Sequence, residues 1–271
     1  MLFYFQPLIY TLVFFLALEA LVLRYYWMDV AAWFLIIFTV LIIWPLTKKP
    51  RFVALPFFLS FGALTLLFFV DHFWEQQIFI ILSSATYYLT ILGGYRLRYY
   101  SCDQTALGMV NLATIATAFF WLTSAFAWFL NYQIENWIMM LFLLAAVFFI
   151  SLPSFFICVL DRKKREKKAA FKGARKGSIC CRKENLSFVS VIFLSLVLSF
   201  SISQLLWGII FWPFSYLTLG ASGLIIFYEL WDLARVYLRG ELSGKRIAFN
   251  LSLGALLLAG ILLSAQWHLV V

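Results

Sequence analysis

Charged residues are scarce in this sequence. They make up 12% of the 271 residues, whereas soluble proteins contain about 25%. Hydrophobic residues make up 65%, aromatic residues 20%, and the mean hydropathy is +0.95. A chain of 31.5 kDa cannot bury that much apolar surface in a water-soluble core, but lipid can solvate apolar side chains on the outside of a helical bundle. The composition therefore excludes a soluble globular domain and predicts an all-α, polytopic transmembrane bundle.

Patterns typical of catalytic and cofactor sites are also missing. The sequence contains no P-loop, no glycine-rich dinucleotide motif and no CxxC pair. Its two histidines, His72 and His268, are expected at span ends, where they are poorly placed to ligate a haem inside a bundle. No Lys or Arg falls in the middle of an expected span. We therefore expect no cofactor and no metal ion, and we favour a non-enzymatic protein over an enzyme.

Nine apolar runs are candidates to cross a membrane, which takes roughly 20 residues. They are Leu2–Leu23, Met28–Leu46, Phe52–Val70, Gln77–Tyr95, Thr105–Leu130, Trp137–Leu160, Leu186–Phe211, Phe214–Trp231 and Ile247–Val271. Because lipid cannot bond to backbone N–H and C=O groups, each run is predicted to be a helix. The polar stretch 161–185 divides the chain into a six-span bundle, 1–160, and a three-span bundle, 186–271.

The basic residues indicate an orientation. With nine spans, one side of the membrane receives all the Lys and Arg residues except Arg24. Since Lys and Arg near span ends are retained on the cytoplasmic side, we predict the N-terminus inside and the C-terminus outside, in the plasma (cytoplasmic) membrane. The four cysteines, Cys102, Cys158, Cys180 and Cys181, then lie at the cytoplasmic face, where thiols stay reduced, so we expect no disulfide.

The basic segment, residues 161–185, carries eleven basic and three acidic residues, a net charge of +8 out of +9 for the chain. We predict that it contacts anionic lipid at the cytoplasmic face, where each Lys or Arg contributes about 1 kcal/mol. The alternative is a docking site for a protein partner. Nucleic acid is not expected, because Phe171 is the segment's only aromatic residue. The candidate contact residues are Arg162, Lys163, Lys164, Arg165, Lys167 and Lys168.

A stripe of polar residues follows the fifth expected span. Asn111, Thr114, Thr117 and Ser124 recur at helical spacing and share one face with Trp121 and Trp128. Such a stripe is typical of interhelical packing with side-chain hydrogen bonds. The alternative is a groove for a lipid headgroup, a polyprenyl carrier or a small neutral solute.

Few acidic residues fall within the expected spans, where ionisable groups often mark function. Glu19 is predicted to pair with Arg24. Glu229 and Asp232 are expected near the inner end of the eighth span, where their helical spacing with the arginines Arg235 and Arg239 predicts ion pairs within one helix.

The segment Gly220-Ala221-Ser222-Gly223 resembles the GxSG motif of rhomboid intramembrane proteases. The resemblance implies Ser222 as nucleophile and His268, on the last expected span, as its base. The match covers four residues, and it departs from the family because no span separates the two expected helices. Gly and Ser at this spacing also mark close helix packing in lipid. We therefore expect a non-enzymatic transporter-like or accessory protein, with an intramembrane serine hydrolase as the alternative.

Overall fold

A computed structural model describes residues 2–23, 33, 37, 39, 54–100, 103–132, 134–171 and 188–265. Within these ranges the chain forms eight long helices and no strand. They are α1 (Leu2–Leu23), α3 (Ala54–Leu67), α4 (Phe73–Tyr99), α5 (Gln104–Tyr132), α6 (Asn136–Phe171), α7 (Phe188–Ile209), α8 (Tyr216–Arg239) and α9 (Gly244–Ser264).

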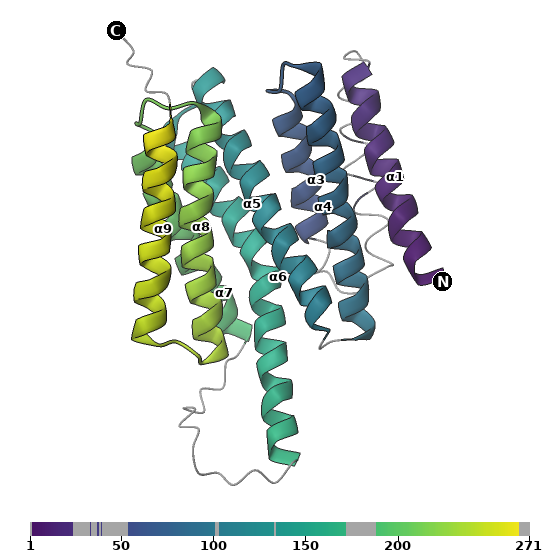
Figure 1. Cartoon of the computed structure of the whole chain (residues 1–271), viewed down its shortest axis with the longest axis vertical. Helices are drawn as coiled ribbons and strands as arrows, with labels where there is room; N and C mark the ends of the chain where they lie inside the picture. The colour runs from purple at the N-terminus through teal and green to yellow at the C-terminus, as the bar shows by residue number, and fades with distance from the viewer. Residues whose placement is uncertain are drawn as a thin grey trace.

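All but one of these helices are long and apolar enough to cross a membrane; the exception, α3, has 14 residues. The helices lie side by side in one bundle (Figure 1). The chain therefore has the character of a helical integral membrane protein, which confirms the predicted fold class. The count of nine spans and their orientation stay predictions, because the expected second span, Met28–Leu46, falls mostly outside the described residues. The third expected span is shorter than predicted, since its helix ends at Leu67 and turns there.

Helix α5 is central to the bundle. It packs against α3, α4, α6 and α8, while α1 leans on α4 and α9 leans on α8 (Figure 1). We call one end of the bundle the basic end, where α4, α6 and α8 carry Arg98, Arg162 and Arg239. We call the other end the acidic end, where Glu75 lies in the first turn of α4 and Glu135 precedes α6. α1 begins at the basic end and α9 finishes at the acidic end (Figure 1).

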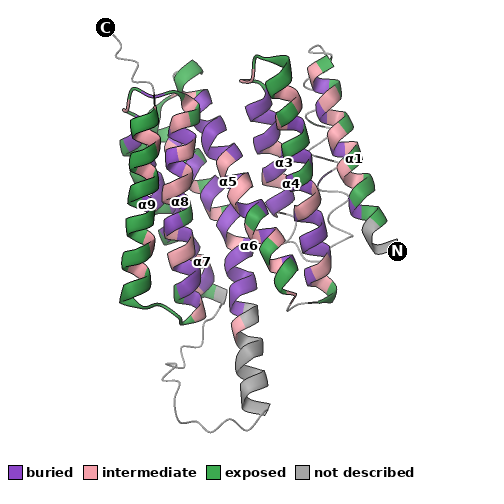
Figure 2. Ribbon diagram, viewed as in Figure 1, coloured by how far each residue is buried: buried purple, intermediate pink, exposed green. Residues whose placement is uncertain are grey.

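Two apolar clusters hold the helices together. One joins the four helices α5, α6, α7 and α8 around large buried side chains such as Phe126, Phe155 and Phe227. The other joins α1, α3 and α4, where the rings of Phe14 and Tyr87 stack with their centroids 4.2 Å apart. Outside these clusters, large apolar side chains are exposed on the bundle surface, most of all along α9 (Figure 2). This surface suits contact with lipid tails.

Two helices extend beyond the spans expected from hydropathy. α6 has 36 residues, about 54 Å at 1.5 Å per residue, and its last turns project past the other helices at the basic end (Figure 1). The sequence does favour this extension, since Glu166 lies among lysines at helical spacing. α8 continues eight residues past Trp231 to Arg239. Glu229 therefore lies deeper in the helix than its predicted place near the span end.

The turn between α4 and α5 is fixed by Asp103. Its carboxylate accepts hydrogen bonds from the Thr105 hydroxyl at 2.6 Å and the Thr105 backbone N–H at 3.0 Å, and it pairs with Arg96 at 3.3 Å. The hydrogen bond from the Thr105 hydroxyl is the main reason why the pKa of Asp103 is lowered from its ordinary value of 3.8. Asp103 thus caps the N-terminus of α5.

We expect Asp103→Asn to lower the melting temperature of the purified protein by a few degrees at neutral pH. Because the folded-state pKa is depressed, the stabilisation by Asp103 is complete above the unfolded-state pKa and is lost as the pH falls through the folded-state pKa. The difference between wild type and variant should therefore shrink under strongly acidic conditions. Thermal unfolding in detergent across a pH series checks this, with the exposed Asp71→Asn as control; a difference that is independent of pH would contradict it.

Candidate functional site

Two residues of the polar stripe of α5, Thr114 and Thr117, form hydrogen bonds within their own helix. The hydroxyls of Thr114 and Thr117 are fully buried and donate to the carbonyls of Val110 and Ala113, at 2.8 and 2.7 Å. Asn111, nearer the basic end, is half-buried. These three residues therefore lie on the predicted face without forming an interhelical bond among the described residues.

Ser124 is different, because it reaches another helix. Its hydroxyl donates to Thr65 Oγ1 on α3 at 2.7 Å, and Thr65 in turn donates to the Phe61 carbonyl at 2.9 Å. One turn away, the indole N–H of Trp121 donates to the Phe58 carbonyl of α3 at 2.6 Å. The part of the stripe nearer the acidic end thus attaches the short helix α3 to α5.

An apolar hollow of about 260 Å³, which we call the apolar slot, opens beside this attachment, between α3, α5 and α6. Its lining presents only apolar surface. Three lining residues, Trp128, Ile138 and Phe142, are exposed at the bundle surface, so the hollow is accessible from the lipid side. The full lining is Phe61, Thr65, Ala125, Trp128, Ile134, Ile138, Met139 and Phe142. Sequence reasoning missed this site, although Trp128 belongs to the stripe, because its walls come from three separate spans.

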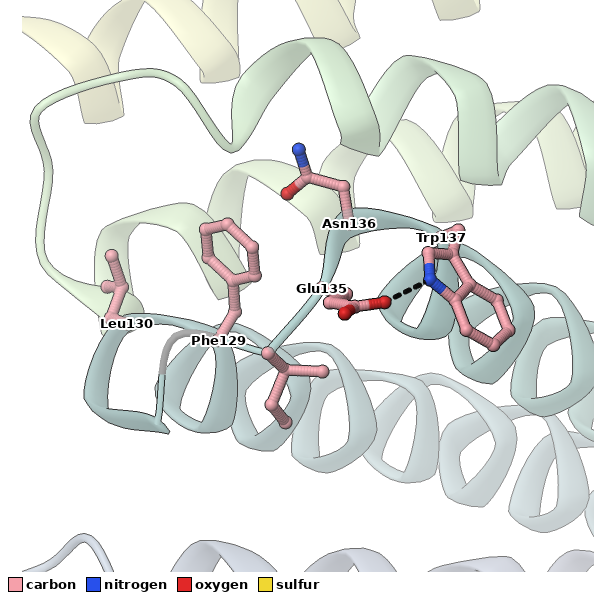
Figure 3. Close-up of a pocket in the computed structure, with 6 residues that line it drawn as sticks. Phe129, Leu130, Glu135, Asn136 and Trp137 are labelled. Carbon is pink, nitrogen blue, oxygen red and sulfur yellow. Dashed lines mark hydrogen bonds between the residues drawn. The ribbon is translucent and has the colours of Figure 1, made fainter.

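A second, wider and shallower hollow of about 600 Å³ lies at the α5–α6 turn, and we call it the rim hollow. Its lining is Phe129, Leu130, Ile134, Glu135, Asn136 and Trp137. The Glu135 carboxylate accepts a hydrogen bond from the indole N–H of Trp137, while the Asn136 side chain points away from this pair (Figure 3). Ile134 lines both hollows, so a rim that carries two polar side chains, Glu135 and Asn136, adjoins the apolar slot.

The Gly220–Gly223 segment lies in tight contacts between helices. A Cβ on Gly220 would lie 2.3 Å from Thr123 Oγ1 of α5, and a Cβ on Gly223 would lie 2.9 Å from Leu206 Cδ2 of α7. Ser222 is fully buried, and its hydroxyl has no hydrogen-bond partner among the described residues. His268 lies outside the described residues. Both glycines thus allow the close approach that the packing interpretation requires.

The basic segment is only partly described. Arg162 donates from Nη1 to the Leu238 carbonyl at 3.1 Å, so it ties α6 to the C-terminal turn of α8. The backbone of α6 carries Lys163, Lys164, Arg165, Lys167 and Lys168 beyond the bundle (Figure 1), but their side chains lie outside the description. Their contact with anionic lipid or a partner stays a prediction.

Two acidic residues within the spans, Glu19 and Asp232, accept hydrogen bonds from neighbouring helices. Glu19 accepts a hydrogen bond from Gln77 of α4 at 3.2 Å, while Arg24 lies outside the described residues. Asp232 accepts from Asn250 of α9 at 3.1 Å instead of pairing with an arginine of its own helix. The expected ion pairs within α8 do not form, because its acidic side chains face α9 and Arg235 lies over the ring of Trp231.

Fold and hollows together define a helical integral membrane protein with an apolar slot that opens at the bundle surface near one end. Residues 180–264, which include α7, α8 and α9, match the family described as "Protein of unknown function (DUF5656)". No curated protein and no solved structure matches the chain. The similarity therefore concerns the three C-terminal helices, and the slot lies in the preceding part of the chain.

Proposed function

We propose that this chain is a non-enzymatic multi-pass membrane protein, transporter-like or accessory, that binds a lipid-like amphiphile. The apolar chain of this amphiphile occupies the slot between α3, α5 and α6, and its polar headgroup lies in the rim hollow. The observation that carries the proposal is the junction of the two hollows at Ile134. An amphiphile needs an apolar compartment in contact with one that offers polar groups, and the slot and the rim hollow with Glu135 and Asn136 meet here.

The chemistry of the apolar slot favours a hydrocarbon chain over a polar solute. Thr65 is the one lining residue with a side-chain hydroxyl, and that hydroxyl is already bonded to Ser124 and to the Phe61 carbonyl. The surface that the slot presents to a ligand is therefore apolar. At about 260 Å³ it is slightly smaller than sites for drug-sized ligands, roughly 300–1,000 Å³, which suits one chain.

The rim hollow favours a neutral or amine-bearing headgroup. Its polar lining residues are Glu135 and Asn136, and the further acidic residues Asp71 and Glu75 belong to the same end of the bundle. A carboxylate repels a phosphate at short range and attracts an ammonium group or a hydroxyl donor. The Trp137 indole, which donates to Glu135, keeps this carboxylate at the rim.

The basic segment supplies the second part of the proposed role. The projection of α6 past the bundle supports a contact of residues 161–185 with anionic lipid at the cytoplasmic face, or with a protein partner. We place the protein in the plasma membrane with this end inside, as the positive charge favours. Of the predicted groove residues on α5, Ser124 then acts by holding α3 beside the slot.

The packing of α8 supports this function over the serine hydrolase alternative. A nucleophile must meet both its base and its substrate. Ser222 is fully buried, and the glycines on either side of it lie against α5 and α7. Entry of a peptide or ester bond would require these helices to separate.

The experiment tests the proposed lipid binding by filling the slot with a larger side chain. Ala125 is buried in its wall, so Ala125→Leu inserts three carbon atoms into the space assigned to the lipid chain. Purified protein is reconstituted with a lipid that carries a photoreactive diazirine on its acyl chain, and labelled peptides are mapped by mass spectrometry. We expect labelling around Met139 and Phe142 in the wild type and a several-fold loss in the variant.

The matched control is Ala255→Leu, the same change on the exposed surface of α9. It should leave labelling at the slot unchanged. Equal labelling of the wild type and Ala125→Leu, or wild-type labelling no stronger at the slot than along α9, would overturn the proposal.

A further inference from the structure

Glu229 is a carboxyl group buried in the membrane-spanning part of α8. Its side chain is 7% exposed, and its Oε2 has no hydrogen-bond partner among the described residues. It lies ten residues before the end of α8 at Arg239, about 15 Å from the basic end at 1.5 Å per residue. An ionised carboxylate at this depth is strongly unfavourable unless a cation compensates it.

The facing helix has a notch that fits this carboxyl group. A Cβ on Gly254 of α9 would lie 2.7 Å from Glu229 Cγ, 2.8 Å from its Cδ and 2.9 Å from its Oε1. Any larger residue at 254 would occupy the space of the carboxyl group. The absence of a side chain at this position is therefore what lets α9 close over Glu229.

A polar pair lies one turn nearer the basic end. Asp232 of α8 accepts a hydrogen bond from Asn250 of α9 at 3.1 Å, and both side chains are half-buried. On each helix these residues are about one turn from the Glu229–Gly254 contact. The α8–α9 interface thus carries polar groups from the basic end inward to a buried carboxyl group.

Among the side chains that the structure describes, the surrounding helices supply no partner charge. Arg235 follows on α8, but its guanidinium carbon lies 4.3 Å from the centre of the Trp231 ring. From α6, Cys158 is buried and Arg162 donates to the carbonyl of Leu238 near the end of α8. α5 and α7, which also pack against α8, contain no Asp, Glu, Lys, Arg or His. On α9 the basic residues are confined to its first turn.

We propose that Glu229 binds a small monovalent cation, a proton or Na⁺, inside the α8–α9 interface. Asp232 and Asn250 form the polar path by which the cation reaches it from the basic end. Binding neutralises the carboxylate and so makes its place in the membrane compatible with lipid. The site involves other helices than the lipid slot and does not depend on the proposed lipid binding.

The test uses a fluorescent hydrophobic carbodiimide, which partitions into lipid and modifies carboxyl groups that carry a proton. Full-length protein in liposomes is labelled across a pH series, in sodium or choline chloride, and the modified peptide is identified by mass spectrometry. We expect labelling of the Glu229 peptide that falls about tenfold per pH unit above its titration midpoint. Glu229→Gln should abolish this labelling.

The salt arms identify the cation. Several-fold slower labelling in sodium than in choline chloride assigns Na⁺ as an occupant, whereas equal rates with the same pH dependence assign the proton alone. A wild-type protein that retains its fold but shows no labelling of Glu229, or labelling that responds neither to pH nor to sodium, overturns the proposal.

The notch has a matched pair of variants. Gly254→Ala places a methyl group where the carboxyl group lies, so we expect the labelling rate of Glu229 to change several-fold. Gly260→Ala, on the same helix, adds a methyl group with no atom within 4 Å and should leave the rate unchanged. Equal rates in the two variants would show that Gly254 does not form the site.

Discussion

Gly220→Ala is expected to destabilise the bundle by about 1–3 kcal/mol, the range for an extra carbon forced into a packed interior. The added Cβ would lie 2.3 Å from Thr123 Oγ1 and 2.9 Å from Thr123 Cα. The hydroxyl can rotate away, but the backbone atom cannot. Relief therefore requires α8 and the central helix α5 to move apart, and this weakens one of the main interfaces of the bundle.

Thermal unfolding in detergent, followed by tryptophan fluorescence, measures the effect. A loss of this size lowers the melting temperature of a protein of this length by about 2–12 °C. Gly208→Ala on α7 is the control, since a Cβ there meets no atom within 4 Å and alanine is the better helix former. It should be neutral or slightly stabilising.

A second variant tests the contact itself. In a Thr123→Ala background the 2.3 Å contact with Oγ1 is removed, so Gly220→Ala should cost less there than in the wild type. Equal costs in both backgrounds would assign the clash to the Thr123 backbone alone, whereas a melting temperature that matches the Gly208→Ala control would contradict the close approach of α5 and α8.

The sequence predicts the helices well because membrane insertion depends on local properties. The length of an apolar run and the helical bonding of its backbone are set within one segment, and α5 differs by one residue at its start and two at its end from the predicted run Thr105–Leu130. The extension of α6 toward Phe171 is likewise local, since it follows from helix formers and charge spacing. The packing of Gly220 is different. Its pattern fits a motif of catalysis as well as one of packing, and only the presence of Thr123 opposite distinguishes them.

The depth of Glu229 could not be predicted from hydropathy. Charged residues after Trp231 suggest that the span ends there, yet α8 continues to Arg239. The helix tolerates these residues because its neighbours cover them: Gly254 leaves room for Glu229, Asn250 bonds Asp232, and Trp231 stacks with Arg235. A hydropathy average counts the charge of each side chain but contains no information about the surface that faces it.

The apolar slot could not be predicted from the sequence for the same reason, because it depends on the surfaces of neighbouring helices. One of its wall residues on α5, Trp128, belongs to the predicted stripe, but the apolar slot depends on how far α3 and α6 lie from Ala125. The polar members of the stripe also have different roles that spacing cannot separate. Thr114 bonds its own helix, whereas Ser124 bonds α3.

Trp121→Ala is expected to have the second large effect, a loss of about 3 kcal/mol. Trp121 is buried among rings of three neighbours: its centroid lies 5.4 Å from that of Phe58, 5.3 Å from that of Phe61 and 4.7 Å from that of Phe142. Truncating a buried Trp costs about 3–5 kcal/mol in soluble cores, and the lower end applies here because separated helices remain solvated by lipid. Trp121→Phe should cost less, about 0.5–1.5 kcal/mol, for the hydrogen bond to Phe58.

The ring cluster also connects stability to the proposed lipid site. Phe61 and Phe142, which contact Trp121, line the apolar slot, so Trp121→Ala should enlarge the slot and redistribute photoreactive lipid labelling among α3, α5 and α6. Trp207→Ala, on an exposed position of α7, is the control for loss of an indole at the lipid surface. Both variants are compared by melting temperature and by labelling. If Trp121→Ala matches Trp207→Ala in both, the α3–α5–α6 contact does not depend on this ring, and the assignment of the slot wall fails with it.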